Sequence, residues 1–124
     1  MAVKLPVLEV SFIAEEDLSD YQYHFVALST TEGYVKAIDT TSETVIGVLQ
    51  NKPTIGESAS IMTIGISKVV AGEALNPNDV VDAEFISATD SGKAIVYVSG
   101  GDRLGIVIIA ASAEDKLASI RLTI

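Results

Sequence analysis

The apolar positions of this chain fall in short runs rich in Val and Ile, interrupted at close intervals by Gly, Asn, Asp, Ser and Thr. Such runs are typical of β-strands bounded by turns, and no stretch shows the spacing of a long amphipathic helix. Nine strands are predicted, at residues 23–28, 34–38, 45–49, 59–64, 68–71, 79–81, 93–98, 104–109 and 118–124. Many short strands at this spacing favour an all-β fold, as a small β-barrel or a sandwich-like domain.

The predicted strands fall into two similar halves. Three features recur in the same order: a turn that ends in Gly33 or Gly92, a strand that carries Gly47 or Gly105, and a strand with the string Ala-Ser-Ile. The copies are offset by 59, 58 and 59 residues, a drift that loops tolerate. The glycines inside the two apolar strands indicate a tight bend or a close backbone approach, or else a merely tolerated glycine.

The repeat predicts the domain organisation. We expect a single β domain over residues 21–124, with an internal repeat over approximately 23–65 and 79–124. Residues 1–20 precede the repeat and are predicted to form an extended N-terminal arm. Each half alone would leave open strand edges, and pairing between the halves would close them.

The apolar side chains of the arm change phase between positions 7 and 8, so one straight strand cannot bury them all on one face. A bulge, or two separate docking segments, would reconcile the pattern. Pro6 lacks a backbone N–H and restricts the segment to a sheet edge. We interpret the segment as an arm that binds another surface, by strand addition or by inserting side chains into grooves; the alternative is an edge strand of its own sheet. The predicted contact residues are Leu5, Val7, Leu8, Val10 and Phe12.

Composition and charge limit the partners. A chain of 124 residues with 48% hydrophobic residues is typical of one folded domain. Its 17 acidic and 8 basic residues give a formal charge of −9, which repels phosphate backbones and anionic membranes, so neither nucleic acid nor membrane is predicted as a partner. The N-terminus lacks the pattern of a signal peptide, and the absence of Cys excludes disulfides and thiolate chemistry.

No motif predicts catalysis or a cofactor. The single histidine, His24, is interpreted as a partly buried or surface residue, since nothing indicates a catalytic triad. Residues 76–79 and 15–17 offer oxygen ligands or paired carboxylates but lack the spacing of a calcium loop, and we interpret them as polar turns. No glycine-rich phosphate-binding motif occurs. The chain is therefore predicted to be no enzyme, with no cofactor and no metal site.

Three phrases resemble the capsid decoration, or cement, proteins of tailed bacteriophages: EEDLSDYQYHFVAL, VIGVLQNKPTIGESASIMTIGISKVVAG and DSGKAIVYVSGGDRLGIVI. The most specific motifs are GVLQNKP at residues 47–53 and SKVVAG at residues 67–72. The resemblance spans about residues 15–109. One departure is the loop at residues 76–79, where the family commonly has a Gly before its Asp.

The resemblance implies a β-barrel-like domain that binds the outer face of an assembled phage head and reinforces it, usually as a homotrimer, although some relatives act as monomers. It implies the major capsid protein lattice as the partner and the outer capsid surface of the virion, assembled in the host cytoplasm, as the location. An alternative is a carbohydrate-binding β module displayed on a virion or a cell. Sugar sites usually present exposed aromatic platforms, whereas this chain has no Trp and only seven other aromatic residues.

Overall fold

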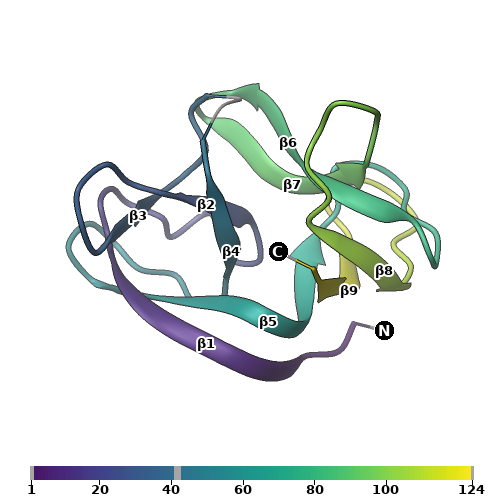
Figure 1. Ribbon diagram of the computed structural model, residues 1–124, viewed down its shortest axis with the longest axis horizontal. Helices are drawn as coiled ribbons and strands as arrows, with labels where there is room; N and C mark the ends of the chain where they lie inside the picture. The colour runs from purple at the N-terminus through teal and green to yellow at the C-terminus, as the bar shows by residue number, and fades with distance from the viewer. Residues whose placement is uncertain (1, 41–42, 124) are drawn as a thin grey trace.

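The computed structural model describes residues 2–40 and 43–123, where it has nine β-strands and no helix. The prediction of an all-β fold is therefore confirmed. No part of these ranges forms the long apolar helix that could span a membrane. The strands are β1 (Leu5–Ala14), β2 (Phe25–Leu28), β3 (Tyr34–Lys36), β4 (Val45–Leu49), β5 (Ser58–Val70), β6 (Val80–Ser87), β7 (Asp90–Val96), β8 (Gly105–Ile109) and β9 (Leu117–Leu122). In Figure 1, β1 to β4 gather on one side and β6 to β9 on the other, with β5 running through both groups.

The strand boundaries differ most from prediction around β5 and β6. The strands predicted at 59–64 and 68–71 are one strand, because Gly65 stays paired with Pro6 of β1 instead of forming a turn. The strand predicted at 79–81 continues to Ser87, where it forms a hairpin with β7. The last residue of the strand predicted at 118–124 lies outside the described residues.

The first half of the chain forms a closed ring of five strands in the order β1-β3-β2-β4-β5. The β1–β3 pair is parallel, and the antiparallel β1–β5 pair closes the ring. Its interior is a cluster of buried apolar side chains, which comprises Ala14, Leu18, Val26, Val35, Ala37, Leu49, Ala59 and Ile61. The ring therefore has a hydrophobic core of its own.

The second half pairs its strands in the same order. The second part of β5 pairs with β9, β9 with β8, β8 with β6, and β6 with β7, all antiparallel. One parallel bridge between Ala71 and Ala94 then joins the end of β5 to β7. The second part of β5 thus corresponds to β1, β6 to β2, β7 to β3, β8 to β4, and β9 to the first part of β5.

Backbone hydrogen bonds follow the same correspondence. Ala14 exchanges two such bonds, both of 2.9 Å, with residues 56–57. Ala71 exchanges the equivalent two bonds, of 2.9 and 2.8 Å, with residues 115–116. This agreement supports the internal repeat and extends the correspondence to β1, which the sequence comparison left outside it.

The repeated glycines have the same roles in both halves. The turn glycines Gly33 and Gly92 have φ angles of 84° and 91°. A Cβ atom on Gly47 would lie 2.2 Å from a carbonyl oxygen of β5, and one on Gly105 would lie 2.8 Å from a carbonyl oxygen of β9. Of the alternatives left open for Gly47 and Gly105, a close backbone approach is the one observed.

The N-terminal segment is a strand of the first ring. Residues interpreted as part of an arm form β1, which pairs with β5 of the same chain, so the alternative of a strand in its own sheet is the one observed. The predicted bulge is confirmed: the β1–β5 register shifts between Pro6 and Leu8 and again between Leu8 and Glu9. The division into residues 1–20 and 21–124 stays a prediction.

A second apolar cluster joins the two halves. Phe25, Val48 and Met62 form a directly paired row across β2, β4 and β5, here called the joint row, on the outside of the first ring. All three side chains are fully buried. They share one cluster with side chains of the second half, including Val81 and Ile120. The halves are therefore packed together through a continuous core.

Candidate docking surface

The five predicted contact residues lie on β1 but differ in exposure. Val10 and Phe12 are half-buried and pack against the interior of the first ring. The other three are exposed, and so is the β5 residue that pairs with Leu8. These exposed residues, called the N-terminal strip from here on, are Leu5 (61%), Val7 (75%), Leu8 (45%) and Ile64 (49%). The strip, which joins three of the predicted contact residues to Ile64, is an apolar docking candidate.

The free edge of β1 is protected against strand addition. Because β3 pairs only with Ile13 and Ala14, the earlier part of β1 has no second neighbour strand. Pro6 lies in this part, two register shifts distort it, and an ion pair of 3.2 Å between Lys4 and Glu9 spans it. Proline, bulges and charges of this kind disfavour pairing with a foreign strand. Of the two predicted modes, insertion of apolar side chains is therefore favoured.

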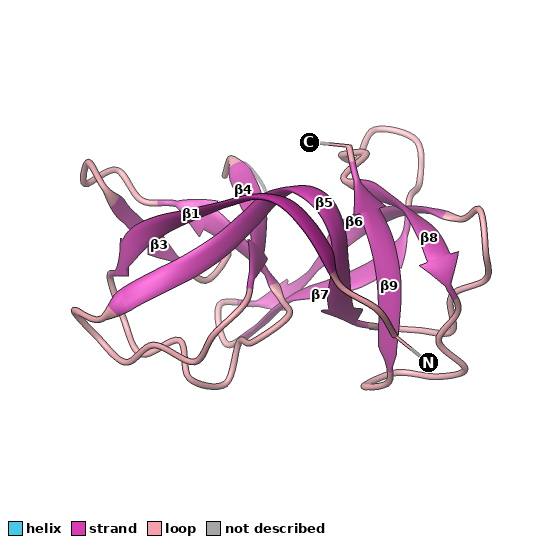
Figure 2. Cartoon of the chain, turned by 90° about the horizontal axis from the view of Figure 1, so that it is seen from below, coloured by secondary structure: helices cyan, strands magenta, loops and turns pink. Residues whose placement is uncertain are grey.

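The start of the chain is anchored to the second half. The Val3 N–H donates to the Ser119 hydroxyl at 2.6 Å, and that hydroxyl donates to the Val3 carbonyl at 2.9 Å. Ser119 is fully buried on β9, and Figure 2 shows the N-terminal segment beside that strand. The anchor holds the N-terminal strip in place before any partner binds, which lowers the entropy cost of docking.

Several residues of the segments that carry the family resemblance make hydrogen bonds that hold the strands together. The Gln50 side chain donates to the Val48 carbonyl and to the Ser67 hydroxyl, both at 2.9 Å. The Asn51 side chain bonds the backbone of β5 through both its donor and its acceptor, at 2.9 and 3.0 Å. Gln50 and Ser67 come from the two most specific motifs, and both are buried. The resemblance therefore rests largely on residues that maintain the fold, and contact residues must be sought elsewhere.

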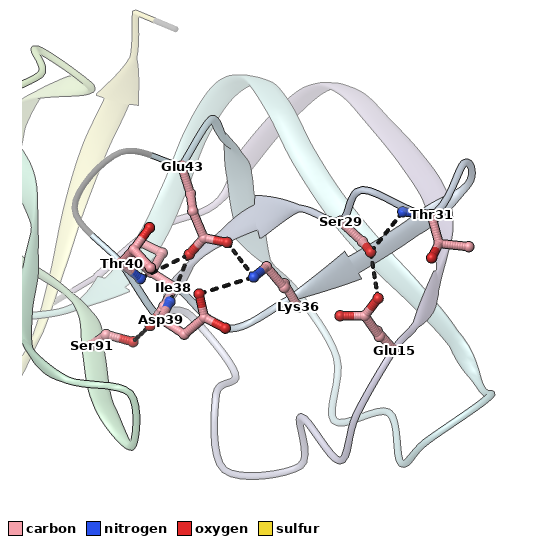
Figure 3. Close-up of polar contacts among 9 residues, drawn as sticks. All are labelled: Glu15, Ser29, Thr31, Lys36, Ile38, Asp39, Thr40, Glu43 and Ser91. Carbon is pink, nitrogen blue, oxygen red and sulfur yellow. Dashed lines mark hydrogen bonds and ion pairs between the residues drawn. The ribbon is translucent and has the colours of Figure 1, made fainter.

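A polar cluster stabilises the segment after β3 (Figure 3). Lys36 forms ion pairs with Asp39, at 2.9 Å, and with Glu43. The hydrogen bond from Lys36 lowers the pKa of Asp39. The Ser91 hydroxyl donates to the Ile38 carbonyl at 2.6 Å and so links this segment to β7. These ion pairs and hydrogen bonds connect the segment to β3 and β7, so the cluster has a structural role.

His24 is half-buried, as interpreted from the sequence. One ring nitrogen lies 3.1 Å from the Gln22 carbonyl, and the ring meets Tyr21 edge-on at 5.4 Å between centroids. Burial lowers the pKa of the imidazole. The half-buried ring is thus held by its packing against Tyr21 and by one backbone contact.

The polar segments interpreted as turns are turns. The Asp79 side chain accepts from the Asn76 N–H at 2.9 Å, and the Asp79 N–H donates back to the Asn76 carbonyl at 3.1 Å. Glu15 accepts a hydrogen bond from Ser29, and Asp17 accepts one from the Ser19 N–H. Within residues 2–40 and 43–123, no group of three or more His, Asp or Glu side chains could hold a metal ion.

None of the seven aromatic side chains is classed as exposed. Phe25 is buried and the other six are half-buried. Two of the tyrosine rings are further covered by cations, Tyr23 by Lys68 at 5.8 Å and Tyr97 by Arg103 at 5.3 Å. Across the described residues, no fully exposed aromatic ring offers the platform that the carbohydrate-binding alternative would use.

Glu84 is a buried carboxyl that the sequence interpretation missed. Its side chain on β6 is 8% exposed, and one carboxyl oxygen has no hydrogen-bond partner. Burial raises the pKa of this carboxyl above its ordinary value, with smaller contributions from neighbouring charges such as Asp90. An isolated Glu in an apolar strand gives no signal of this kind in sequence.

We expect E84Q to change how stability depends on pH. A carboxyl whose pKa is higher in the folded than in the unfolded state costs stability as pH rises through that range, because the unfolded chain ionises first. E84Q removes this cost. The free energy of unfolding of E84Q minus that of the unaltered protein should therefore be larger at about pH 8 than at about pH 4. Urea unfolding at both pH values measures the change. E32Q, at an exposed turn, controls for net charge, and an equal pH dependence in both variants would contradict the prediction.

The fold and the surface together define an all-β protein of two similarly paired halves, with an exposed apolar strip on β1 and β5. No family model matches the chain, and neither does any curated protein. Among solved structures, the chain is similar to the N base of head fiber gp8.5 in bacteriophage phi29, with a TM-score of 0.67 and 15% sequence identity. The match covers 94% of this chain and 93% of that chain. At this identity the likeness shows a shared fold.

Proposed function

We propose that this protein is a decoration protein of a bacteriophage head, which binds the outer surface of the assembled capsid and stabilises it. The observation that carries the proposal is the fold shared over almost the whole chain with the base of a head fiber in phage phi29. The sequence resemblance to decoration proteins supports the same function independently of the fold. The phi29 protein is part of a head fiber, and we propose that this protein too is associated with a phage head.

Surface chemistry supports a protein partner. The N-terminal strip offers apolar contacts, and a net charge of −9 disfavours nucleic acid and anionic membranes. The proposed partner is the major capsid protein lattice, and the proposed assembly is a homotrimer. A ligand that binds only the mature lattice stabilises it by mass action, and three attachment points add avidity. In this role the protein needs no catalytic group and no cofactor.

Cosedimentation with purified heads tests the proposal. The protein should sediment with expanded heads of its phage, bind procapsids less well, and raise the temperature at which expanded heads release their DNA. Light scattering of the free protein gives its mass and tests the homotrimer separately. Absence of binding to either kind of head would reject the function.

A single substitution tests the N-terminal strip. We expect L5D to weaken binding to expanded heads by about tenfold, because a buried apolar contact becomes a charge. I55D is the matched control: Ile55 is 71% exposed on a loop outside the strip and adds the same charge. Deletion of the segment is less informative, since β1 closes the first ring. Equal binding of L5D and I55D would exclude the strip as a contact.

A further inference from the structure

The joint row has a counterpart in the second half. Because β6, β8 and β9 correspond to β2, β4 and β5, the residues equivalent to the joint row are Val80, Ile106 and Arg121, which are also directly paired. The pairing continues through Ile66 of β5 to Leu5 of β1. We call this set the outer row: Val80, Ile106, Arg121, Ile66 and Leu5.

The two rows differ in what covers them. The joint row is fully buried because the second half packs on it. In the outer row, Arg121 and Leu5 are exposed and the other three side chains are half-buried. The outer row is thus built like the joint row but remains open. Four of its five side chains are apolar, and it meets the N-terminal strip at Leu5.

The outer row carries an unpaired positive charge on an acidic protein. Arg121 stands where the joint row has Met62, and within the described residues its side chain has neither an ion pair nor a hydrogen bond. No acidic residue belongs to the row, although the chain has 17 acidic against 8 basic residues. Glu9, on the neighbouring part of β1, is already paired with Lys4. The row therefore complements a partner surface that offers a carboxylate among apolar side chains.

A second copy of the chain fits this surface poorly. The side chains of the joint row lie in the apolar cluster of the second half. In that half, a single bridge between Ala71 and Ala94 joins the end of β5 to β7. The first half offers no equivalent opening, because the β1–β5 and β1–β3 pairs close its ring. The observations favour a different protein as the occupant.

We propose that the outer row docks on the capsid protein, with the Arg121 guanidinium against a carboxylate and the apolar side chains around it. This inference rests on the proposed function and names the chemistry of the contact. Arg121 sets the orientation of the docked protein, since a guanidinium and a carboxylate pair through two parallel hydrogen bonds.

Charge reversal tests the inference. R121E should weaken binding to expanded heads by at least about tenfold and flatten its dependence on salt. K52E is the matched control, because Lys52 is exposed in the first half and its reversal gives the same net charge. Equal binding of R121E and K52E, with normal binding of the unaltered protein, overturns the inference and leaves the proposed function standing. Failure of the unaltered protein to bind overturns both.

Chemical coupling identifies the occupant. R121K keeps a cation and supplies an amine that a carbodiimide joins to a carboxylate within contact distance as an amide, the carbodiimide taking up the water as a urea. Mass spectrometry of coupled, decorated heads should find residue 121 linked to an Asp or Glu of the capsid protein. A link from residue 121 to another copy of this chain, together with a dimer mass that R121E abolishes, would overturn the proposal in favour of self-association.

Discussion

Replacing Gly47 by alanine should cost the protein at least about 3 kcal/mol of stability, enough to unfold much of a small domain at ordinary temperatures. The new Cβ would lie 2.2 Å from the Met62 carbonyl oxygen and 2.8 Å from a methyl group of Ile61. Both residues belong to β5, which β1 holds on its other side. The strands cannot separate to make room without breaking the ring of the first half.

Two further glycine variants calibrate this expectation by urea unfolding. G105A meets a carbonyl oxygen at 2.8 Å in the equivalent place and should cost less than G47A. Gly56 has a φ of 81° and open space around the site of a Cβ, so G56A should cost only about 1 kcal/mol of backbone strain. A loss in G47A no larger than that in G56A would show that the close approach does not constrain the fold.

The glycines also show how far sequence could predict this fold. Gly47 and Gly105 interrupt apolar strands at equivalent positions, and that local signal predicted the repeat and offered the close approach as one of its alternatives. The local signal could not predict that β1 belongs to the first ring, because the partner of a strand is set by contacts distant in the chain. The break predicted between residues 64 and 68 was wrong for the same reason: glycine is common in turns, yet Gly65 continues β5 beside Pro6.

The candidate surface was predictable only in part. The change of phase before Leu8 indicated a bulge, but the pairing with β5 decides that Leu5, Val7 and Leu8 stay exposed while Val10 and Phe12 turn inward. For Arg121, the alternation of β9 predicts an outward side chain. Its equivalence to a buried methionine in the first half becomes visible only once the strand order of both halves is known.

Phe25 tests whether the two halves are one folding unit. We expect F25A to lose about 3–5 kcal/mol, because it empties a fully buried site of the joint row. The cluster that loses this side chain contains residues of both halves, so unfolding should remain one cooperative transition at a lower urea concentration. Tyrosine fluorescence and circular dichroism should report the same midpoint.

The half-buried Phe12, which packs against the interior of the first ring, provides a comparison within one half. F12A should cost less than F25A, because part of its side chain already contacts solvent. Two separate transitions in F25A would mean that the second half folds independently and that the joint row is only an interface. A single transition would instead mean that the buried joint row stabilises the whole chain. The outer row, which is equivalent to it but stays open after folding, would then be available to a partner.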